Sequence, residues 1–323
     1  MMQSDTTIQT ARDPALPTFD KPVRAMVCMI GAMLLLPMGD TFSKILTTVQ
    51  NPIEVTLWRL LAQGLFLLPI AFVMRRRLRG SLFSPVVALS GALVATSLVS
   101  LISAFAVMPI ATAIAIFFVE PLLLTLLAGP LLGERPGPRR LVAVGVGLLG
   151  ALVVIRPGFG VYGWATLLPV VAALAYALNM IVLRHASRTR SALTVQCGAT
   201  IYAAVIVLAL TLAMHAGGGL TLAPAAMPPW VWGAILAAGA LAAGSFVLIA
   251  EAFRDAEASS LAPFQYLEIL GATIAGYLVF DNFPDALTWL GIAIILASGI
   301  YVFHREGHDD TDTSAPRRRR AAR

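Results

Sequence analysis

The chain has 323 residues, of which 58% are apolar and 12% are charged, whereas about a quarter of the residues in an ordinary soluble domain are charged. This composition, with a mean hydropathy of +0.83, excludes a disordered chain, a collagen-like repeat and a disulfide scaffold, and it argues against a soluble enzyme. The net charge of +6 does not indicate a nucleic-acid partner, because the arginines lie in short clusters between apolar runs, as cytoplasmic loop charges do.

Apolar runs follow one another along the chain, separated by charges, prolines or glycines. A membrane-spanning helix needs about 20 residues to cross the hydrocarbon core, so about ten helices would use most of the chain. We therefore expect an all-α integral membrane protein in the lipid bilayer, with almost no extramembrane domain. The ten expected transmembrane helices are residues 25–48, 54–74, 83–107, 109–132, 140–155, 163–184, 192–213, 230–252, 259–280 and 287–304.

The placement of arginine predicts the orientation of these spans. With the N-terminus inside the cell, clusters such as Arg75 to Arg77 and Arg317 to Arg320 face the cytoplasm, in agreement with the positive-inside rule. We expect a multi-pass protein of the bacterial inner membrane with both termini in the cytoplasm. Residues 1–24 are polar and indicate a disordered tail, and the basic tail 305–323 is expected to contact anionic lipid.

A shift of 148 residues aligns the two halves of the chain. Residues 104–140 match residues 252–288 without a gap. Each half carries five spans, and because five is odd the second half must enter the membrane from the opposite side. The prediction is two five-helix inverted-topology repeats, residues 25–155 and 163–304, an architecture in which secondary transporters hold their site near the midplane. A monomer suffices, since one chain supplies both halves.

The duplicated segments resemble a known family. The run FFVEPLLLTLLAGPLLGERPG from Phe117 and its counterpart PFQYLEILGATIAGYLVFDNFPD from Pro263 look like the paired EamA domains of the drug/metabolite transporter superfamily. The resemblance covers roughly residues 25–305. It implies a ten-helix bundle with a central cavity that moves a small polar metabolite without ATP and without a cofactor. The turn LLGE of the first half is replaced by VFDN, so Asp281 and Asn282 stand in place of glycine and glutamate.

Within this family the second half is similar to a subgroup that includes bacterial riboflavin importers and S-adenosylmethionine carriers. Riboflavin is the first expectation, since its flat ring can stack on aromatic side chains. S-adenosylmethionine, an amino acid or an amine stays open as the substrate, because a cationic group would suit buried carboxylates. A channel or a structural membrane protein is the alternative of another class. An enzyme is not expected, since the loops carry no paired acid–histidine signature.

Two carboxylates lie at the centres of the fourth and ninth spans, Glu120 and Glu268, and the shift of 148 makes them equivalent. A charge at bilayer depth is costly and marks function by default, so we expect the two to bind a cationic group or to carry protons. A packing role for each is the alternative. Pro121 removes a backbone donor and frees the carbonyl of Phe117, which indicates a kink beside the cavity.

Further polar residues fall inside the spans. Asp40 and Lys44 lie four residues apart on one helix face and are expected to pair, or else to reach water together at the outer interface. Arg59 could attract an anionic group, or it could pair with Asp40 or Glu54. The histidines show no metal-ligand spacing, no P-loop occurs, and GVGLLG at 145–150 indicates close helix packing. Candidates for hydrogen bonding and stacking are Tyr176, Asn179, Gln196, Tyr202, Gln265 and Tyr266.

Overall fold

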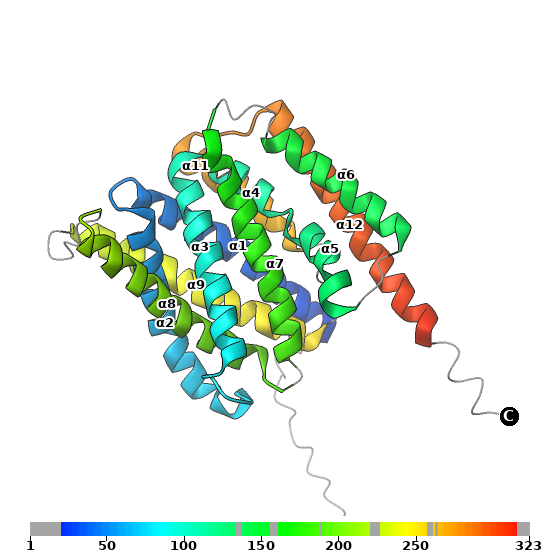
Figure 1. Cartoon of the computed structure of the whole chain (residues 1–323), viewed down its shortest axis with the longest axis horizontal. Coiled ribbons are helices and arrows are strands. Elements are labelled where there is room, and N and C mark those ends of the chain that lie inside the picture. Colours follow the sequence, from blue (N-terminus) through cyan, green and yellow to red (C-terminus); the bar gives the residue numbers. More distant parts are fainter. Residues whose placement is uncertain are drawn as a thin grey trace, which may run out of the picture.

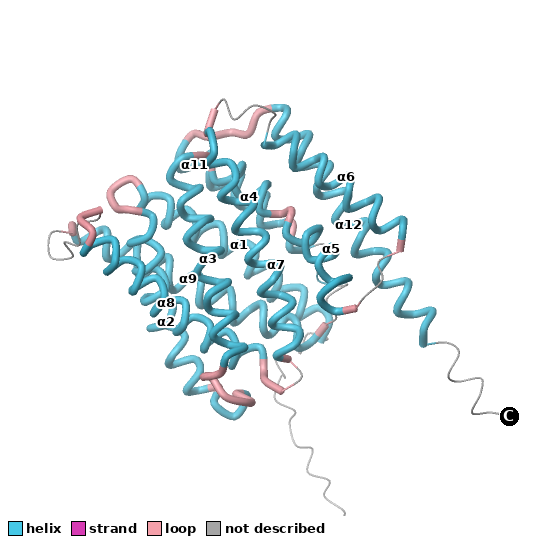
Figure 2. The backbone as a smooth tube through the Cα atoms, viewed as in Figure 1, coloured by secondary structure: helices cyan, strands magenta, loops and turns pink. Residues whose placement is uncertain are grey.

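The computed structural model describes residues 21–133, 137–155, 161–187, 189–219, 227–256, 261 and 264–314. Every regular element in these ranges is a helix, as Figure 2 shows. The longer elements are α1 (Lys21–Thr47), α2 (Pro52–Val73), α3 (Pro85–Val107), α4 (Ile110–Phe117), α5 (Glu120–Leu132), α6 (Pro138–Ile155), α7 (Leu168–Ala186), α8 (Ala192–Ala216), α9 (Pro229–Asp255), α11 (Leu267–Phe280) and α12 (Ala286–Ser314). Two short 3₁₀ turns are η1 (Arg75–Arg77) and η2 (Gly163–Leu167).

The apolar helices account for the expected spans. Seven stretches are long and apolar enough to cross a membrane, counting α4 with α5 as one, and three shorter apolar helices lie within α6, α11 and α12. The all-helical, ten-span prediction is therefore confirmed. Part of the expected span 259–280 and the expected tail up to residue 20 lie outside the described residues. α12 continues to Ser314, so helix enters the region that the sequence assigns to the C-terminal tail.

Local capping chemistry sets several helix ends. The side chain of Asn51 accepts a hydrogen bond from the Ile53 N–H at 3.0 Å, and Pro52 occupies the first turn of α2, where its missing N–H costs nothing. The C-cap of α5 is Gly133 with φ 73°, and the C-cap of α11 is its repeat counterpart Asp281 with φ 55°. The turns LLGE and VFDN thus share a left-handed C-cap, which glycine and aspartate tolerate better than most residues.

The fourth expected span is two helices rather than one. α4 ends at Phe117 and α5 begins at Glu120. Pro121 offers no N–H to the carbonyl of Phe117, and the N–H groups of Leu122 and Leu123 both bond to the carbonyl of Val119 at 3.0 Å. Every residue from Ile110 to Ile116 is buried, so α4 is apolar all round and is surrounded by protein.

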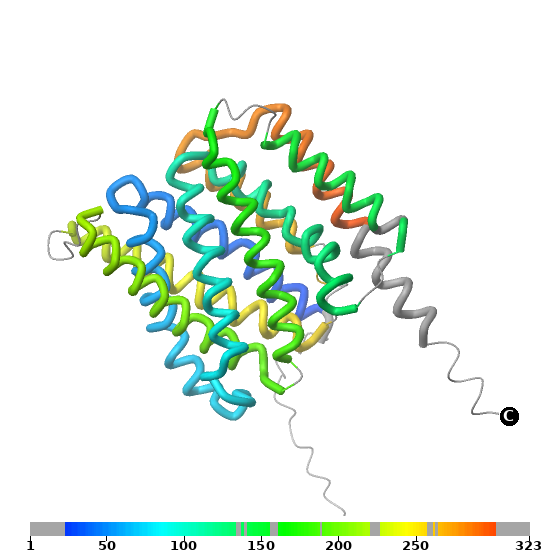
Figure 3. The backbone as a smooth tube through the Cα atoms, in the orientation of Figure 1, coloured from blue at the N-terminus to red at the C-terminus, as the bar shows by residue number. Residues whose placement is uncertain are grey.

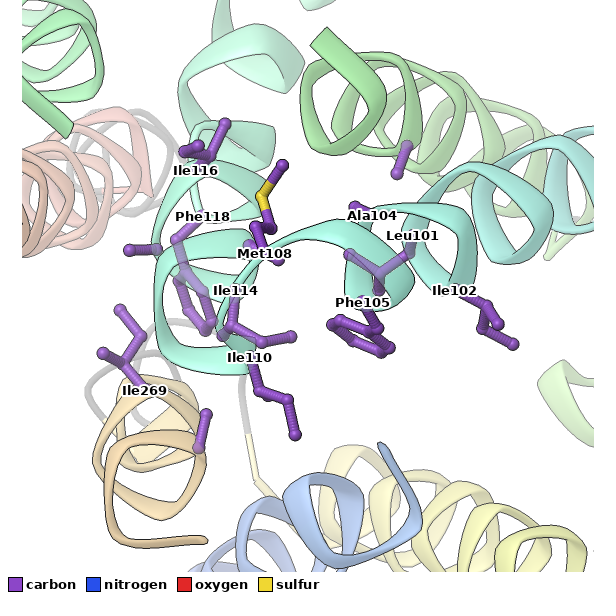
Figure 4. Packing of buried hydrophobic residues seen from close by; sticks show 14 of the residues in the cluster. Leu101, Ile102, Ala104, Phe105, Met108, Ile110, Ile114, Ile116, Phe118 and Ile269 are labelled. Atoms are coloured by element: carbon purple, nitrogen blue, oxygen red, sulfur yellow. The ribbon is translucent and has the colours of Figure 1, made fainter. Parts of the chain in front are cut away.

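Figure 4 shows the core around this segment. Phe105 of α3 and Ile114 of α4 lie in one cluster of buried side chains, and Ile269 of α11 belongs to the same cluster. Because α4 and α11 come from different halves, the core joins the two repeats.

The second half interrupts its helix at the equivalent place. Tyr266, the counterpart of Phe118, lies in a turn before α11, and the N–H of Ile269 donates to its carbonyl at 3.2 Å. Each repeat therefore breaks its helix two residues before its central glutamate, Glu120 or Glu268. Broken helices of this kind expose backbone carbonyl groups at membrane depth, where transporters place their sites.

Helix packing also repeats across the halves. α1 packs along α9 as α7 packs along α3, and α2 packs on α9 as α8 packs on α3. α2 pairs with its counterpart α8, and α6 pairs with its counterpart α12; Figures 1 and 3 show the second pair side by side at one edge of the molecule. Helices of each half thus pack against helices of the other half.

Close packing holds α6 against α12. A methyl group on Gly150 would lie 2.7 Å from Cγ2 of Ile294 and 3.1 Å from the carbonyl oxygen of Gly291. Only a small residue lets the two helices approach this closely. The interpretation of GVGLLG as a packing motif, rather than a nucleotide-binding loop, is confirmed.

Candidate functional site

The two central glutamates lie in the protein interior at the boundary between the repeats. Glu120 is the first residue of α5 and Glu268 is the second residue of α11. Both residues are half-buried. The two are close enough to interact electrostatically. Two neighbouring acids at membrane depth can hold a cationic group or exchange protons.

An ion pair lies beside the glutamates. Nη1 of Arg59 on α2 is 3.0 Å from Oδ1 of Asp40 on α1, and both side chains are only 5% exposed. Glu268 interacts electrostatically with both members of the pair. The pair therefore connects the first two helices to the central carboxylates. This pairing of Arg59 with Asp40 is one of the two interpretations that the sequence left open.

The expected pair between Asp40 and Lys44 is wrong. Lys44 lies one turn closer to the C-terminal end of α1 and donates hydrogen bonds to the carbonyl oxygens of Phe105 at 3.0 Å and Met108 at 2.5 Å. Its ammonium group also lies 5.3 Å from the ring centre of Phe280. The last carbonyls of a helix lack intrahelical donors and favour a cation. Lys44 thus caps the C-terminal end of α3, while Asp40 pairs with Arg59.

Four aromatic rings form a chain beside the glutamates. Tyr176 of α7 lies 5.7 Å from Phe117, Phe117 lies 6.5 Å from Phe118, and Phe118 lies 5.6 Å from Tyr266, all between ring centres. Tyr176 interacts electrostatically with both glutamates and Tyr266 with Glu120. We call Asp40, Arg59, Glu120, Tyr176, Tyr266 and Glu268 the central polar cluster.

Sequence reasoning missed the two phenylalanines. Phe117 and Phe118 stand directly before Val119, Glu120 and Pro121, at the end of α4. The signal was present, because the shift of 148 residues pairs Phe118 with Tyr266. The contact between these two equivalent rings, whose planes are tilted by 40°, depends on how the two repeats dock.

The remaining candidates lie apart from this cluster or have no contact with it that the structure describes. Oδ1 of Asn179 accepts a 2.6 Å hydrogen bond from Ser90, which ties α7 to α3. The ring of Tyr202 on α8 meets that of Phe83, before the start of α3, edge to face with ring centres 6.1 Å apart. Gln265 is half-buried next to the turn at Tyr266. Gln196 is half-buried in α8, and its Nε2 has no hydrogen-bond partner among the described residues.

A metal centre finds no support in the part of the chain that the structure describes. No group of three histidine, cysteine, aspartate or glutamate side chains in that part could hold a metal ion. The residues of the central polar cluster offer hydrogen bonding, ion pairing, proton exchange and aromatic contacts.

Known proteins resemble this chain in sequence and in fold. A riboflavin transporter of Rhizobium johnstonii is 32% identical over 209 residues, which is 64% of this chain and 65% of that protein. A riboflavin transporter of Vibrio cholerae is 30% identical over 60% of this chain and 62% of its own length. The chain thus spans slightly less than two thirds of these two relatives. An S-adenosylmethionine uptake transporter of Rickettsia prowazekii is 27% identical over 276 residues, 83% of this chain and 88% of that protein.

The fold recurs in a solved structure as well. One crystal structure has a TM-score of 0.57 to this chain at 18% identity and covers 86% of this chain and 95% of its own. The family model described as the EamA-like transporter family matches residues 23–156 and again residues 163–303. With both halves of the chain matched, the protein belongs to the EamA-like transporter family.

Proposed function

We propose that this chain is a secondary transporter that moves a small aromatic metabolite through the central polar cluster, with riboflavin as the first substrate to test. The observation that carries this proposal is the placement of Glu120 and Glu268. Two equivalent carboxylates stand at membrane depth next to a chain of four aromatic rings. Carboxyl groups inside a membrane cost free energy, so their presence there indicates a role in substrate binding or in coupling.

Alternating access follows from the inverted repeat. Two similar units of opposite orientation can exchange conformations, so that a site between them opens to one side or the other. The inner end of α9 carries contacts that such an exchange would break. Glu251 pairs with Arg24 at 2.8 Å, with Arg254 at 2.8 Å and with Arg77, and Arg24 also reaches Asp255 at 3.4 Å. Arg24 and Arg77 lie in the first half of the chain and the acids in the second.

The aromatic rings favour a flat substrate. The isoalloxazine ring of riboflavin can stack on aromatic side chains, and its ribityl hydroxyl groups can donate hydrogen bonds to carboxylates. The relatives from Rhizobium and Vibrio are named riboflavin transporters. One observation favours a second substrate: the cluster holds three carboxyl groups, Asp40, Glu120 and Glu268, and a single guanidinium, Arg59. A cationic compound such as S-adenosylmethionine would balance that excess of acid.

Uptake into proteoliposomes tests the proposal. Purified protein is reconstituted, and the entry of labelled riboflavin and of labelled S-adenosylmethionine is followed as a function of concentration. We expect saturable uptake of one of them, inhibited by the unlabelled compound. Glu120→Gln and Glu268→Gln should each lower the rate at least tenfold, about 1.4 kcal/mol, while Arg76→Gln, on exposed η1, should match the unmodified protein. Uptake that never saturates would favour a channel, and no uptake of either compound would reject both substrates.

Orientation completes the proposal. The arginine clusters support a protein of the bacterial inner membrane with both termini in the cytoplasm, and a monomer suffices because one chain carries both repeats. Fusion of alkaline phosphatase or of a fluorescent protein to the C-terminus measures this directly. Fluorescence without phosphatase activity is the expected result, and phosphatase activity would reverse the orientation.

A further inference from the structure

We propose that Gly299 of α12 is a positioning residue for the transported substrate. It provides a notch that seats the hydroxyl group of Tyr266, and it thereby sets the spacing between the rings of Tyr266 and Phe118. The inference rests on the proposed function, because it assumes that a flat substrate stacks on these rings.

The notch is visible in the contact between α12 and the turn before α11. A methyl group on Gly299 would overlap the hydroxyl oxygen of Tyr266 and would lie 3.0 Å from Cζ and 3.6 Å from Cε1 of the same ring. Gly299 is itself buried. The tyrosine hydroxyl therefore occupies the space that a side chain at position 299 would fill, and even alanine would force the ring to move.

The first repeat carries the complementary combination of residues. The shift of 148 residues pairs Tyr266 with Phe118 and Gly299 with Ala151. The first half thus has a ring without a hydroxyl and a residue with a methyl group. The second half has a ring with a hydroxyl and a residue without a methyl group. Relative to the first half, the second half has one more oxygen on its ring and one methyl group fewer on its partner residue, and the two groups are similar in size. This is the pattern expected if the ring and its partner residue contact each other in both halves.

Among the residues that the structure describes, no hydrogen bond holds the hydroxyl group. Its oxygen is buried and has no hydrogen-bond partner among the described residues, an arrangement that destabilises a folded protein. Phenylalanine at this position would avoid that cost. The hydroxyl acts here through its volume: seated in the notch, it holds the ring 5.6 Å from that of Phe118 at 40°.

The consequence concerns substrate affinity. Tyr266 belongs to the central polar cluster, and its ring contacts that of Phe118. If Gly299→Ala expels the hydroxyl, the ring shifts relative to Phe118, and a flat substrate loses its fit between ring and carboxylate. The loss of one aromatic stacking contact corresponds to roughly a tenfold rise in the half-saturating concentration, about 1.4 kcal/mol. The maximal rate should change much less, because α12 lies at the edge of the bundle (Figure 1).

A mutant cycle tests the notch with the full-length protein in proteoliposomes. Uptake of the substrate that the unmodified protein transports is measured for Gly299→Ala, for Tyr266→Phe and for the double variant. We expect Gly299→Ala to raise the half-saturating concentration about tenfold and the double variant to return to the value of Tyr266→Phe, since removal of the hydroxyl removes the overlap. Gly145→Ala on α6, where a methyl group meets nothing within 4 Å, is the matched control and should equal the unmodified protein.

The outcomes separate the two proposals. An unchanged Gly299→Ala variant, or a double variant as impaired as Gly299→Ala, overturns the notch and leaves the proposed function standing. If Gly299→Ala does not fold, Tyr266→Leu is measured in its place. An unchanged half-saturating concentration for Tyr266→Leu would show that the Tyr266 ring does not line the site, which overturns the inference. A tenfold rise would support the inference. Absence of uptake by the unmodified protein overturns the proposed function, and this inference with it.

Discussion

Arg59 offers the sharpest test of how the centre of this protein is held together. Its guanidinium lies 3.0 Å from the carboxylate of Asp40, and both side chains are 5% exposed. Arg59→Met keeps the length of the side chain and removes its charge, which leaves Asp40 buried without its partner. Breaking a buried ion pair on one side typically costs about 3–5 kcal/mol. Solvent screening reduces this value little, because both side chains are almost fully buried.

The double variant Asp40→Asn, Arg59→Met separates the pair from its surroundings. Replacing both partners of a buried pair is often close to neutral, so we expect the double variant to recover most of the stability lost in either single variant. Unfolding of the purified protein in mixed micelles measures the four free energies. Arg76→Met, exposed on η1, is the control and should change stability by less than about 0.5 kcal/mol. A double variant whose loss equals the sum of the two single losses would refute the reasoning.

Three further predictions concern contacts outside the central polar cluster. Lys44→Met removes two hydrogen bonds to the end of α3 and should destabilise the protein by about 1.5–3 kcal/mol in the same unfolding assay; an unchanged value would mean that water replaces the ammonium group. Glu251→Gln weakens the ion pairs that join α1, η1 and α9, so in a Cys197→Ser background a water-soluble maleimide should label Cys28, near the N-terminal end of α1, faster than in the parent. Equal rates would show that this end of the bundle opens without breaking these pairs. Gly150→Ala should lower the yield of folded protein, since its methyl group would lie 2.7 Å from Ile294, whereas Gly145→Ala should not; equal yields would contradict close packing of α6 on α12.

The sequence by itself determined the architecture. The number of spans follows from the thickness of the bilayer, because each apolar run has to match the same hydrocarbon core. The repeat also follows from sequence alone, since equal spacing along the chain places Glu120 and Glu268, and Gly133 and Asp281, at equivalent points of two helices. Pro121 indicated a kink in the fourth span, because a missing N–H acts within one turn of the same helix, and the structure shows a break between α4 and α5 there.

The tertiary structure decided which side chains meet across helices. Asp40 and Lys44 share a helix face, but they contact different helices. Because of the rotation of α1 against α2 and α3, Asp40 pairs with Arg59 and Lys44 bonds to the carbonyl groups at the end of α3. The break at Tyr266 has no proline at the position equivalent to Pro121, so only the backbone hydrogen bond of Ile269 reveals it. A sequence pattern constrains neighbours within one or two turns, whereas contacts such as those of Phe118 with Tyr266 depend on the register and rotation of packed helices, which are set when the two repeats dock.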